Sequence, residues 1–176
     1  HATDEQTRTP LYRATCVAGH FDQGLAVTDL LLARGAALDI FSACTLGELA
    51  RVEHLLEVDP DAARSVDPEG MTALHWAARP RRKPQHAASI MRLLLAHGAD
   101  VHARNPQEDQ MTTLHHVAQW SGSTKQADLL LAHGANLNAT ARHGRTALCY
   151  ATDHGRTDMV AHLSKLGARL PPSQEM

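Results

Sequence analysis

Apolar residues recur along most of the chain at intervals of three and four residues, with small and polar residues between them. The clearest run consists of four apolar residues at helical spacing: Met159, Val160, Leu163 and Leu166. It stops at Gly167, and glycine commonly ends a helix because it adopts positive φ without strain. Just before this run, Leu148 and Ala151 share one side of another helix, which Thr146 can cap. Because Gly155 permits a turn, the pattern predicts two helices joined by that turn.

This two-helix pattern is repeated along the chain. A phrase with Thr at its start and Leu two residues later begins at four positions: Thr9, Thr72, Thr112 and Thr146. Each copy is followed by a Leu-rich run that closes in Gly-Ala, with the glycines at Gly35, Gly98, Gly134 and Gly167. A fifth, degenerate copy lacks the opening phrase but keeps the same offsets at Ile40, Ala43, Gly47, Leu49, Val52, Leu55 and Leu56.

The spacing of the copies locates two insertions. Marker positions at Leu11, Ile40, Leu74, Leu114 and Leu148 are 29, 34, 40 and 34 residues apart. From marker to closing Gly, the first and third copies are each 24 residues long, against 20 and 19 in the last two. We therefore expect the surplus between the two helices of those copies, around residues 19–26 and 79–86. Such a unit cannot bury its apolar side alone, so neighbouring units must stack.

With these phrases and this period, the chain resembles the ankyrin-repeat family over roughly residues 9–170. The resemblance implies an all-α solenoid of five stacked helix-turn-helix units with short β-like finger loops between them. The expected repeats are approximately 9–38, 39–68, 69–103, 104–138 and 139–170, with polar tails at 1–8 and 171–176. Because residues 37–40 leave little room for a finger, we expect a gap in the finger row there.

Composition agrees with a helical stack and narrows the classes of function. Hydrophobic residues make up 43% of the chain but aromatic residues only 3%, which favours close-packed helices over sheets. A formal net charge of -2 gives no strong reason to expect nucleic-acid binding. No apolar stretch is long enough to span a membrane. The three cysteines, Cys16, Cys44 and Cys149, are odd in number and lack a Cys-x-x-Cys spacing, which favours a reducing, cytoplasmic setting.

The 13 histidines do not form a metal-binding pattern. By resemblance, His75 and His115 are the family's opening histidines, expected to hydrogen-bond locally and to tie adjacent repeats together. His97 and His133 precede closing glycines, where a cation at a helix C-terminus is favourable. Because no His-x-x-x-His or Cys-His pairing at zinc spacing occurs, we expect neither a metal nor a cofactor.

The resemblance also indicates where a partner would bind. In the family, contacts usually come from the fingers and from exposed positions on the first helix of each pair. Carried onto this chain, these positions are Glu69, Met71, Arg79, Asp109, Met111, Trp120, Arg142, His143, Arg145, Asp153 and His154.

Four large apolar residues need separate hypotheses. Trp120 is either an exposed anchor for a partner or a core residue folded onto the neighbouring insertion. Met71 and Met111 occupy matching finger positions, where they could form an apolar patch suited to a peptide or helix. Trp76 follows the opening His, so we expect it to be mostly structural.

The insertion after the third opening phrase is strongly basic. Arg81, Arg82 and Lys83 follow Arg79 in a loop that prolines keep extended. This loop either grips an acidic partner or phosphates, or is simply solvated.

The sequence as a whole predicts a non-catalytic, monomeric scaffold that binds another protein or peptide through its concave groove and fingers. The alternative is an enzyme or enzyme accessory that uses the groove as a pocket. Its acid-base groups would be His116, Glu69, Asp109, Asp153 and His154, gathered on one wall. A third reading is that the chain is one module of a larger protein, because it begins at His1 without an initiator Met.

Overall fold

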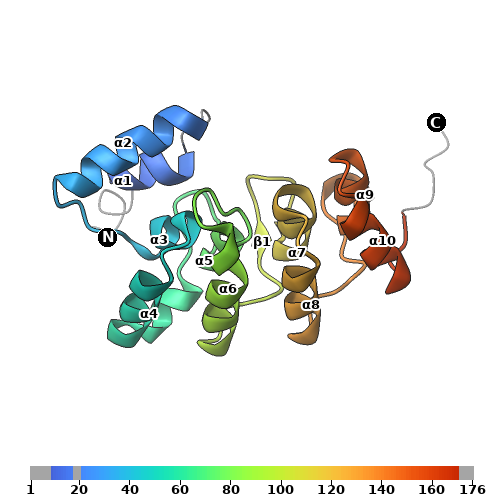
Figure 1. Cartoon of the computed structure of the whole chain (residues 1–176). Helices are drawn as coiled ribbons and strands as arrows, with labels where there is room; N and C mark the ends of the chain where they lie inside the picture. The colour runs from blue at the N-terminus through green and yellow to red at the C-terminus, as the bar shows by residue number, and fades with distance from the viewer. Residues whose placement is uncertain (1–8, 18–20, 171–176) are drawn as a thin grey trace.

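The structure is a computed structural model that describes residues 9–17 and 21–170, with side chains omitted for residues 16, 17 and 21–23. The predicted tails, 1–8 and 171–176, and the side chain of Cys16 lie outside the described residues. Helical segments dominate the described part, and they follow one another as successive pairs (Figure 1). The all-α solenoid predicted from the sequence is confirmed.

From α3 to α10, the first helices of the pairs form one row in Figure 1 and the second helices form another. The first helices are α1 (Pro10–Tyr12) continued by η1 (Arg13–Val17), α3 (Ile40–Leu46), α5 (Ala73–Ala77), α7 (Thr113–His116) continued by η4 (Val117–Ser121), and α9 (Ala147–Asp153). The second helices are α2 (Phe21–Ala33), α4 (Leu49–Val58), α6 (Ala87–Ala96), α8 (Thr124–Ala132) and α10 (Thr157–Lys165). Short η2 (Pro60–Arg64), η3 (Pro84–His86) and η5 (Arg142–Gly144) lie in the connections.

Short β-pairings form the fingers between the later pairs. Strand β1 (Arg104–Asn105) runs antiparallel to β2 (Met111–Thr112). Single antiparallel bridges, Val66 with Thr72 and Thr140 with Thr146, form the corresponding fingers on either side. Residues 34–39 connect α2 to α3 directly, without a β-bridge among the described residues.

The opening phrase caps the first helices and ties neighbouring pairs together. The backbone N–H of Thr72 donates to Nδ1 of His75 (3.2 Å), and the backbone N–H of His75 donates to Oγ1 of Thr72 (3.3 Å). Thr112 makes the same box with His115, whose Nε2 also donates to the carbonyl oxygen of Arg145 in the next finger (3.2 Å). The predicted role of His115, a local hydrogen bond and a tie to the adjacent unit, is confirmed.

The core is made of small and aliphatic side chains, and Trp76 lies inside it. Its indole Nε1–H donates to Oδ2 of the buried Asp67 (2.6 Å). The same carboxylate accepts the hydroxyl of Tyr12 (2.8 Å). The structural role predicted for Trp76 is therefore confirmed, and Asp67 connects the first pair of helices to the third.

The predicted insertion at 79–86 is confirmed, whereas the one at 19–26 is partly wrong. A loop separates α5 from α6, and its backbone returns to the second pair, where the N–H of Arg81 donates to the carbonyl oxygen of Thr45 (2.8 Å). In the first pair, residues 21–26 belong to α2, so the surplus lengthens a helix, while residues 18–20 lie outside the described part. A continuous helix satisfies its own backbone hydrogen bonds, which a loop cannot do.

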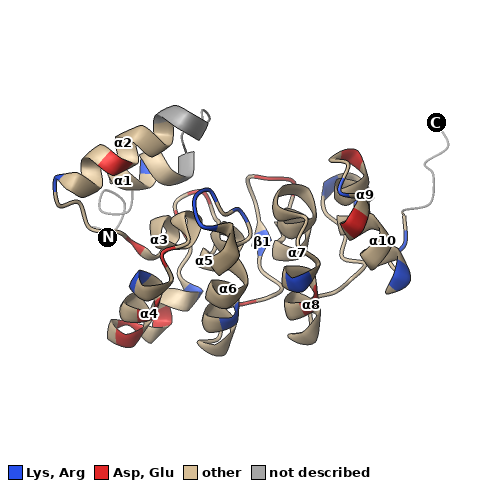
Figure 2. Cartoon of the chain, viewed as in Figure 1, with Lys and Arg blue, Asp and Glu red and all other residues tan. Residues whose placement is uncertain are grey.

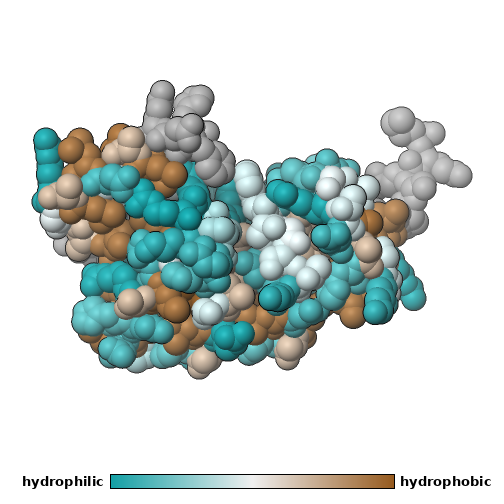
Figure 3. Space-filling model, in the orientation of Figure 1, coloured by the Kyte–Doolittle hydropathy of each residue, from teal (hydrophilic) through white to brown (hydrophobic). Residues whose placement is uncertain are grey.

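Helix α2 lies beside α1 and η1 and does not continue the row of second helices (Figure 1). Its outward side keeps apolar residues exposed, including Val27 and Leu30, and brown side chains cover this region in Figure 3.

Replacing Gly47 by Ala is expected to destabilise the fold by about 2–3 kcal/mol. Gly47 ends α3 at φ 73°, and a Cβ there would lie 2.6 Å from the carbonyl oxygen of Lys83 in the insertion. The control is Gly155→Ala, at the equivalent turn in the last pair, where φ is 64° but nothing lies within 4 Å of a Cβ. Urea unfolding should show a clearly larger loss for Gly47→Ala. Equal losses would mean that the insertion does not hold its close approach to Gly47.

Candidate interaction site

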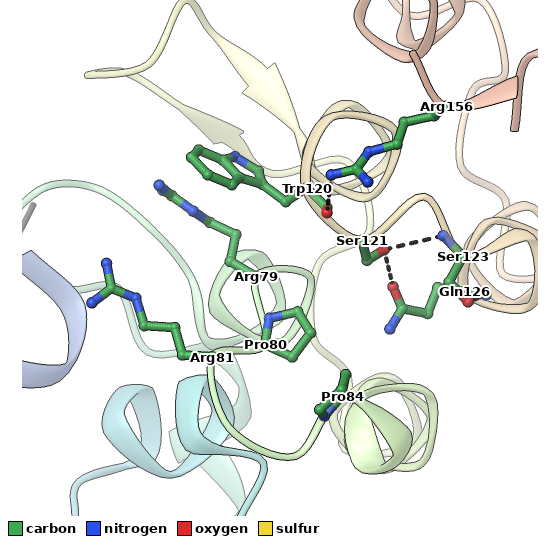
Figure 4. A pocket seen from close by; sticks show the side chains of 9 residues that line it. All are labelled: Arg79, Pro80, Arg81, Pro84, Trp120, Ser121, Ser123, Gln126 and Arg156. Atoms are coloured by element: carbon green, nitrogen blue, oxygen red, sulfur yellow. Dashed lines mark hydrogen bonds between the residues drawn. The ribbon is translucent and has the colours of Figure 1, made fainter. Parts of the chain in front are cut away.

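A cleft of about 490 Å³ opens where the insertion after α5, the end of η4 and the start of α10 come together (Figure 4). Its cationic and apolar lining consists of Arg79, Arg81, Arg156, Pro80, Pro84 and Trp120. The remainder of the wall is polar and uncharged, so no carboxylate lines the cleft. Of the sequence-predicted binding positions, the structure places Arg79, Arg81 and Trp120 here.

The side chain of Arg79 is fixed between two indole rings. Its Cζ lies 4.6 Å from the centroid of the Trp120 ring and 5.3 Å from that of Trp76. Its Nη1–H also donates to Oε1 of Glu108 (2.8 Å). Contacts with both indole rings and a carboxylate at the tip hold the guanidinium, and through it the Trp120 ring, in one position.

Trp120 combines features of both hypotheses made for it. The ring packs against Arg79 at the start of the insertion, yet 37% of the residue remains exposed. It is therefore not a core residue. Its role as an anchor for a partner stays a prediction.

Arg156 enters the cleft from the last pair of helices (Figure 4). Its Nη2–H donates to the carbonyl oxygen of Trp120 (2.8 Å), and its Nε–H donates to that of Gln119 (3.4 Å). Gly122 leaves room for this approach, since a Cβ at that position would lie 3.1 Å from Cδ of Arg156. The sequence pattern did not indicate Arg156, because this residue follows the turn into a second helix, outside the finger and first-helix positions.

The remaining cations of the insertion are paired inside the protein. Arg82 forms an ion pair with Asp29 on α2 (2.7 Å), and Lys83 forms one with Glu48 before α4 (2.7 Å). Figure 2 shows these basic residues of the insertion, in blue, near α3 and α5. The hypothesis that this basic loop grips an acidic partner stays a prediction, and within the protein Arg82 and Lys83 already have carboxylate partners. These two residues tie the insertion to the first two pairs.

The apolar patch predicted from Met71 and Met111 is wrong. The two residues are only 2% and 3% exposed, and both belong to the core cluster. Met111 lies in β2, both residues of which are buried, and Met71 directly precedes the bridging Thr72. Both finger positions therefore turn their side chains inward.

The other finger residues form contacts outside the cleft. Arg145 pairs with Asp153 and lies over the ring of Tyr150 (4.6 Å). The backbone N–H of Arg142 donates to the carbonyl oxygen of Asp109 in the preceding finger (2.6 Å). His143 adopts φ 59° in η5 at the tip of its finger.

The acid-base wall suggested by the enzyme alternative does not form. His116 is fully buried, and its Nδ1 lies 3.8 Å from Oε2 of Glu108. Glu69 accepts the hydroxyl of Tyr12 in the first pair, while Asp153 is held by Arg145 in the last. Nδ1 of His154 donates to the carbonyl oxygen of Tyr150 (3.0 Å). His116 is therefore buried, and the other three side chains make separate contacts, so they do not form one acid-base wall.

Two further findings bear on the kinds of site the chain could carry. Among residues 9–17 and 21–170, no three His, Cys, Asp or Glu side chains converge in a group that could hold a metal ion. None of the helices in the described part combines the length and the apolar character needed to cross a membrane.

Known proteins resemble this chain both in a family model and in individual sequences. Residues 82–172 match the family model described as Ankyrin repeats (3 copies). The B-cell lymphoma 3 protein homolog of Mus musculus is 35% identical over 100 residues, which cover 57% of this chain and 21% of the relative. The palmitoyltransferase akr1 of Schizosaccharomyces pombe is 41% identical over 64 residues, covering 36% of this chain and 9% of that protein. A probable E3 ubiquitin-protein ligase XBOS34 of Oryza sativa subsp. japonica is 32% identical over 107 residues, covering 57% and 20%.

Proposed function

The chain belongs to the ankyrin-repeat family, and on this premise we propose that it is a non-catalytic scaffold that binds another protein or peptide through its groove and cleft. Repeats of this kind generally serve as protein-interaction scaffolds, because a stack of helices presents an extended, stiff surface. The matched regions span between 9% and 21% of the relatives named above. Their transferase and ligase names therefore describe those whole proteins and are not part of this proposal.

The observation that carries the proposal is the state of Trp120. Among the Phe, Tyr and Trp residues with described side chains, it is the one with more than a third of its surface exposed. Tryptophan and arginine supply a large share of the energy in many protein interfaces. Because Arg79 already holds the ring beside the cleft, little side-chain entropy would be lost on binding.

The same proposal takes the chain to act as a monomer in the cytoplasm. Cys149 carries a free thiol, which supports a reducing setting.

Trp120→Ala is expected to weaken peptide binding by about tenfold or more, since truncating an interface tryptophan typically costs about 2 kcal/mol. Random peptides displayed on phage would be selected on the immobilised wild-type protein, and the enriched sequences synthesised. Their affinities for wild type and variant would be compared by calorimetry, with unfolding midpoints measured in parallel.

The matched control is Val58→Ala, which removes an exposed apolar side chain from α4, away from the cleft. It should leave the affinities unchanged. Failure of the wild type to retain any peptide above a bare support, or equal affinity of the Trp120→Ala protein, would contradict the proposed function.

A further inference from the structure

We propose that the cleft beside Trp120 takes an acidic peptide segment of the partner, in which a carboxylate side chain binds Arg156 and a neighbouring apolar residue covers the indole ring. The inference rests on the proposed function, because it names the class of partner that the same surface binds. Its elements are the guanidinium of Arg156, the amide of Gln126 and an apolar wall.

The charges of the cleft are unevenly balanced. Arg79 has its counter-charge in Glu108 at 2.8 Å. Arg156 instead bonds two backbone carbonyl oxygens, and no carboxylate lies within 4.0 Å of its guanidinium among the residues that the structure describes. Carbonyl groups orient a guanidinium without neutralising it. A carboxylate on a ligand would supply the missing charge in a bidentate geometry that suits arginine.

Gln126 adds a second donor on the same side of the cleft. It is only 3% exposed, and its Oε1 accepts the hydroxyl of Ser121 (2.6 Å). Oγ of Ser121 also accepts the backbone N–H of Ser123 (3.3 Å) and lies 3.3 Å from the carbonyl oxygen of Val117. Figure 4 shows the Nε2 end of Gln126 turned toward Pro84 and the open space. No protein acceptor bonds this Nε2 in the described part of the chain.

Nε2 of Gln126 faces the cleft and is not among the buried polar atoms that lack a partner, so a water or a ligand oxygen in the cleft can complete its bonding. Arg156 and Gln126 therefore both present donors, and the wall that contains them offers no acidic side chain. An oxygen acceptor with negative charge is the ligand group that fits both.

The apolar part of the lining favours a peptide over a polyanion. Pro80, Pro84 and Trp120 form a wall that a phosphodiester backbone would leave uncovered. Binding of nucleic acid depends on rows of cations, whereas Arg82 and Lys83 are already paired with Asp29 and Glu48. The formal net charge of the chain is -2, which also opposes a polyanion.

The volume of the cleft, about 490 Å³, lies within the range of ~300–1,000 Å³ that small-ligand pockets have.

The test uses the same phage-displayed random peptides, selected in parallel on wild type, Arg156→Gln, Arg156→Lys and Arg92→Gln. Arg92 is an exposed residue on α6, so Arg92→Gln removes the same charge outside the cleft. Peptides retained by wild type and by Arg92→Gln should contain at least ~2-fold more Asp and Glu than the unselected library. Peptides retained by Arg156→Gln should not show this enrichment. Arg156→Lys keeps the charge and should keep the enrichment.

The peptide that binds the wild-type protein most tightly would then be synthesised together with a neutral version, in which each Glu is replaced by Gln and each Asp by Asn. The neutral version should bind wild type at least ~10-fold more weakly but bind Arg156→Gln with about the same affinity as the acidic one. A single-stranded oligothymidylate should not displace the peptide.

The outcomes separate the two proposals. Peptides that need Trp120 but show no acidic enrichment, or that keep it on Arg156→Gln, would overturn the acidic-peptide inference and leave the scaffold proposal standing. Displacement by the oligonucleotide at comparable concentration would also overturn it, in favour of a general anion site. Loss of all peptide binding by wild type would instead overturn the proposed function, and the inference with it.

Discussion

Replacing Asp67 by Ala is expected to lower the free energy of unfolding by about 3–5 kcal/mol. The buried carboxylate accepts four donors: Tyr12 Oη–H (2.8 Å), Trp76 Nε1–H (2.6 Å) and the backbone N–H groups of Met71 (2.8 Å) and Glu69 (2.9 Å). Alanine leaves the indole and the Met71 amide buried without an acceptor, and each such group costs about 1–3 kcal/mol. Urea unfolding followed by circular dichroism measures the loss.

Three variants test this explanation. Tyr12→Phe removes one hydrogen bond of the network and should cost about 1 kcal/mol. Asp67→Asn keeps one acceptor oxygen and should fall between wild type and Asp67→Ala. Glu53→Ala removes an exposed carboxylate from α4 and should change stability by less than about 0.5 kcal/mol. A loss below about 1 kcal/mol for Asp67→Ala would show that the network does not hold the first helical pair to the third.

Acidification from pH 7 to pH 4 is expected to remove about 6 kcal/mol of stability through His75 and His115. Burial is the main reason that the pKa of each imidazole is lowered from 6.5 to about 4. The unfolded chain therefore binds more protons than the folded protein between these values, so stability is complete above about pH 6.5 and falls as pH decreases. Each shift corresponds to about 3 kcal/mol, and their sum is comparable to the total stability of many domains.

Two other groups modify this profile. Burial lowers the pKa of His116 well below its usual value, and the nearby His75 adds to the shift, so His116 contributes in the same direction. Asp39 acts in the opposite direction, because burial raises the pKa of its carboxyl group. Protonated Asp39 is favoured in the folded protein, so its stabilisation is present at low pH and is lost as pH rises.

The measurement is urea unfolding at intervals between pH 7.5 and pH 4, and His116→Leu provides the comparison. Leucine fills similar space and removes two ring nitrogens that have no hydrogen-bond partner among the described residues. The variant should be at least as stable as wild type at pH 7 and should lose less stability on acidification. A wild-type stability that is flat down to pH 5 would contradict the buried-histidine explanation, as would an unchanged slope in His116→Leu.

Local patterns in the sequence were sufficient for the architecture. Thr72 and His75 lie three residues apart, so the capping box they form depends on one turn of backbone alone. The surplus spacing located the insertion at 79–86 for a similar reason, because a fixed helix length leaves extra residues for the connection. The burial of Trp76 followed from its position directly after the opening His, which sets the side of the helix it occupies.

Contacts between units could not be read in this way. The sequence placed Met71 and Met111 on exposed fingers, but the strand pairing turned them into the core. It grouped His116, Glu69 and Asp153 on one wall, whereas His116 is buried and Glu69 and Asp153 make separate contacts with Tyr12 and Arg145.

The sequence by itself determined the repeat, the helix pairs, the capping histidines and the presence of a basic insertion beside a tryptophan. Only the tertiary structure decided that Arg79 holds Trp120, that Arg82 and Lys83 turn back to Asp29 and Glu48, and that Arg156 and Gln126 complete the cleft. Periodicity fixes which face of a helix a residue occupies. Which faces of different units meet depends on how the units stack and where a long loop runs, and both are set by packing between residues far apart in the chain.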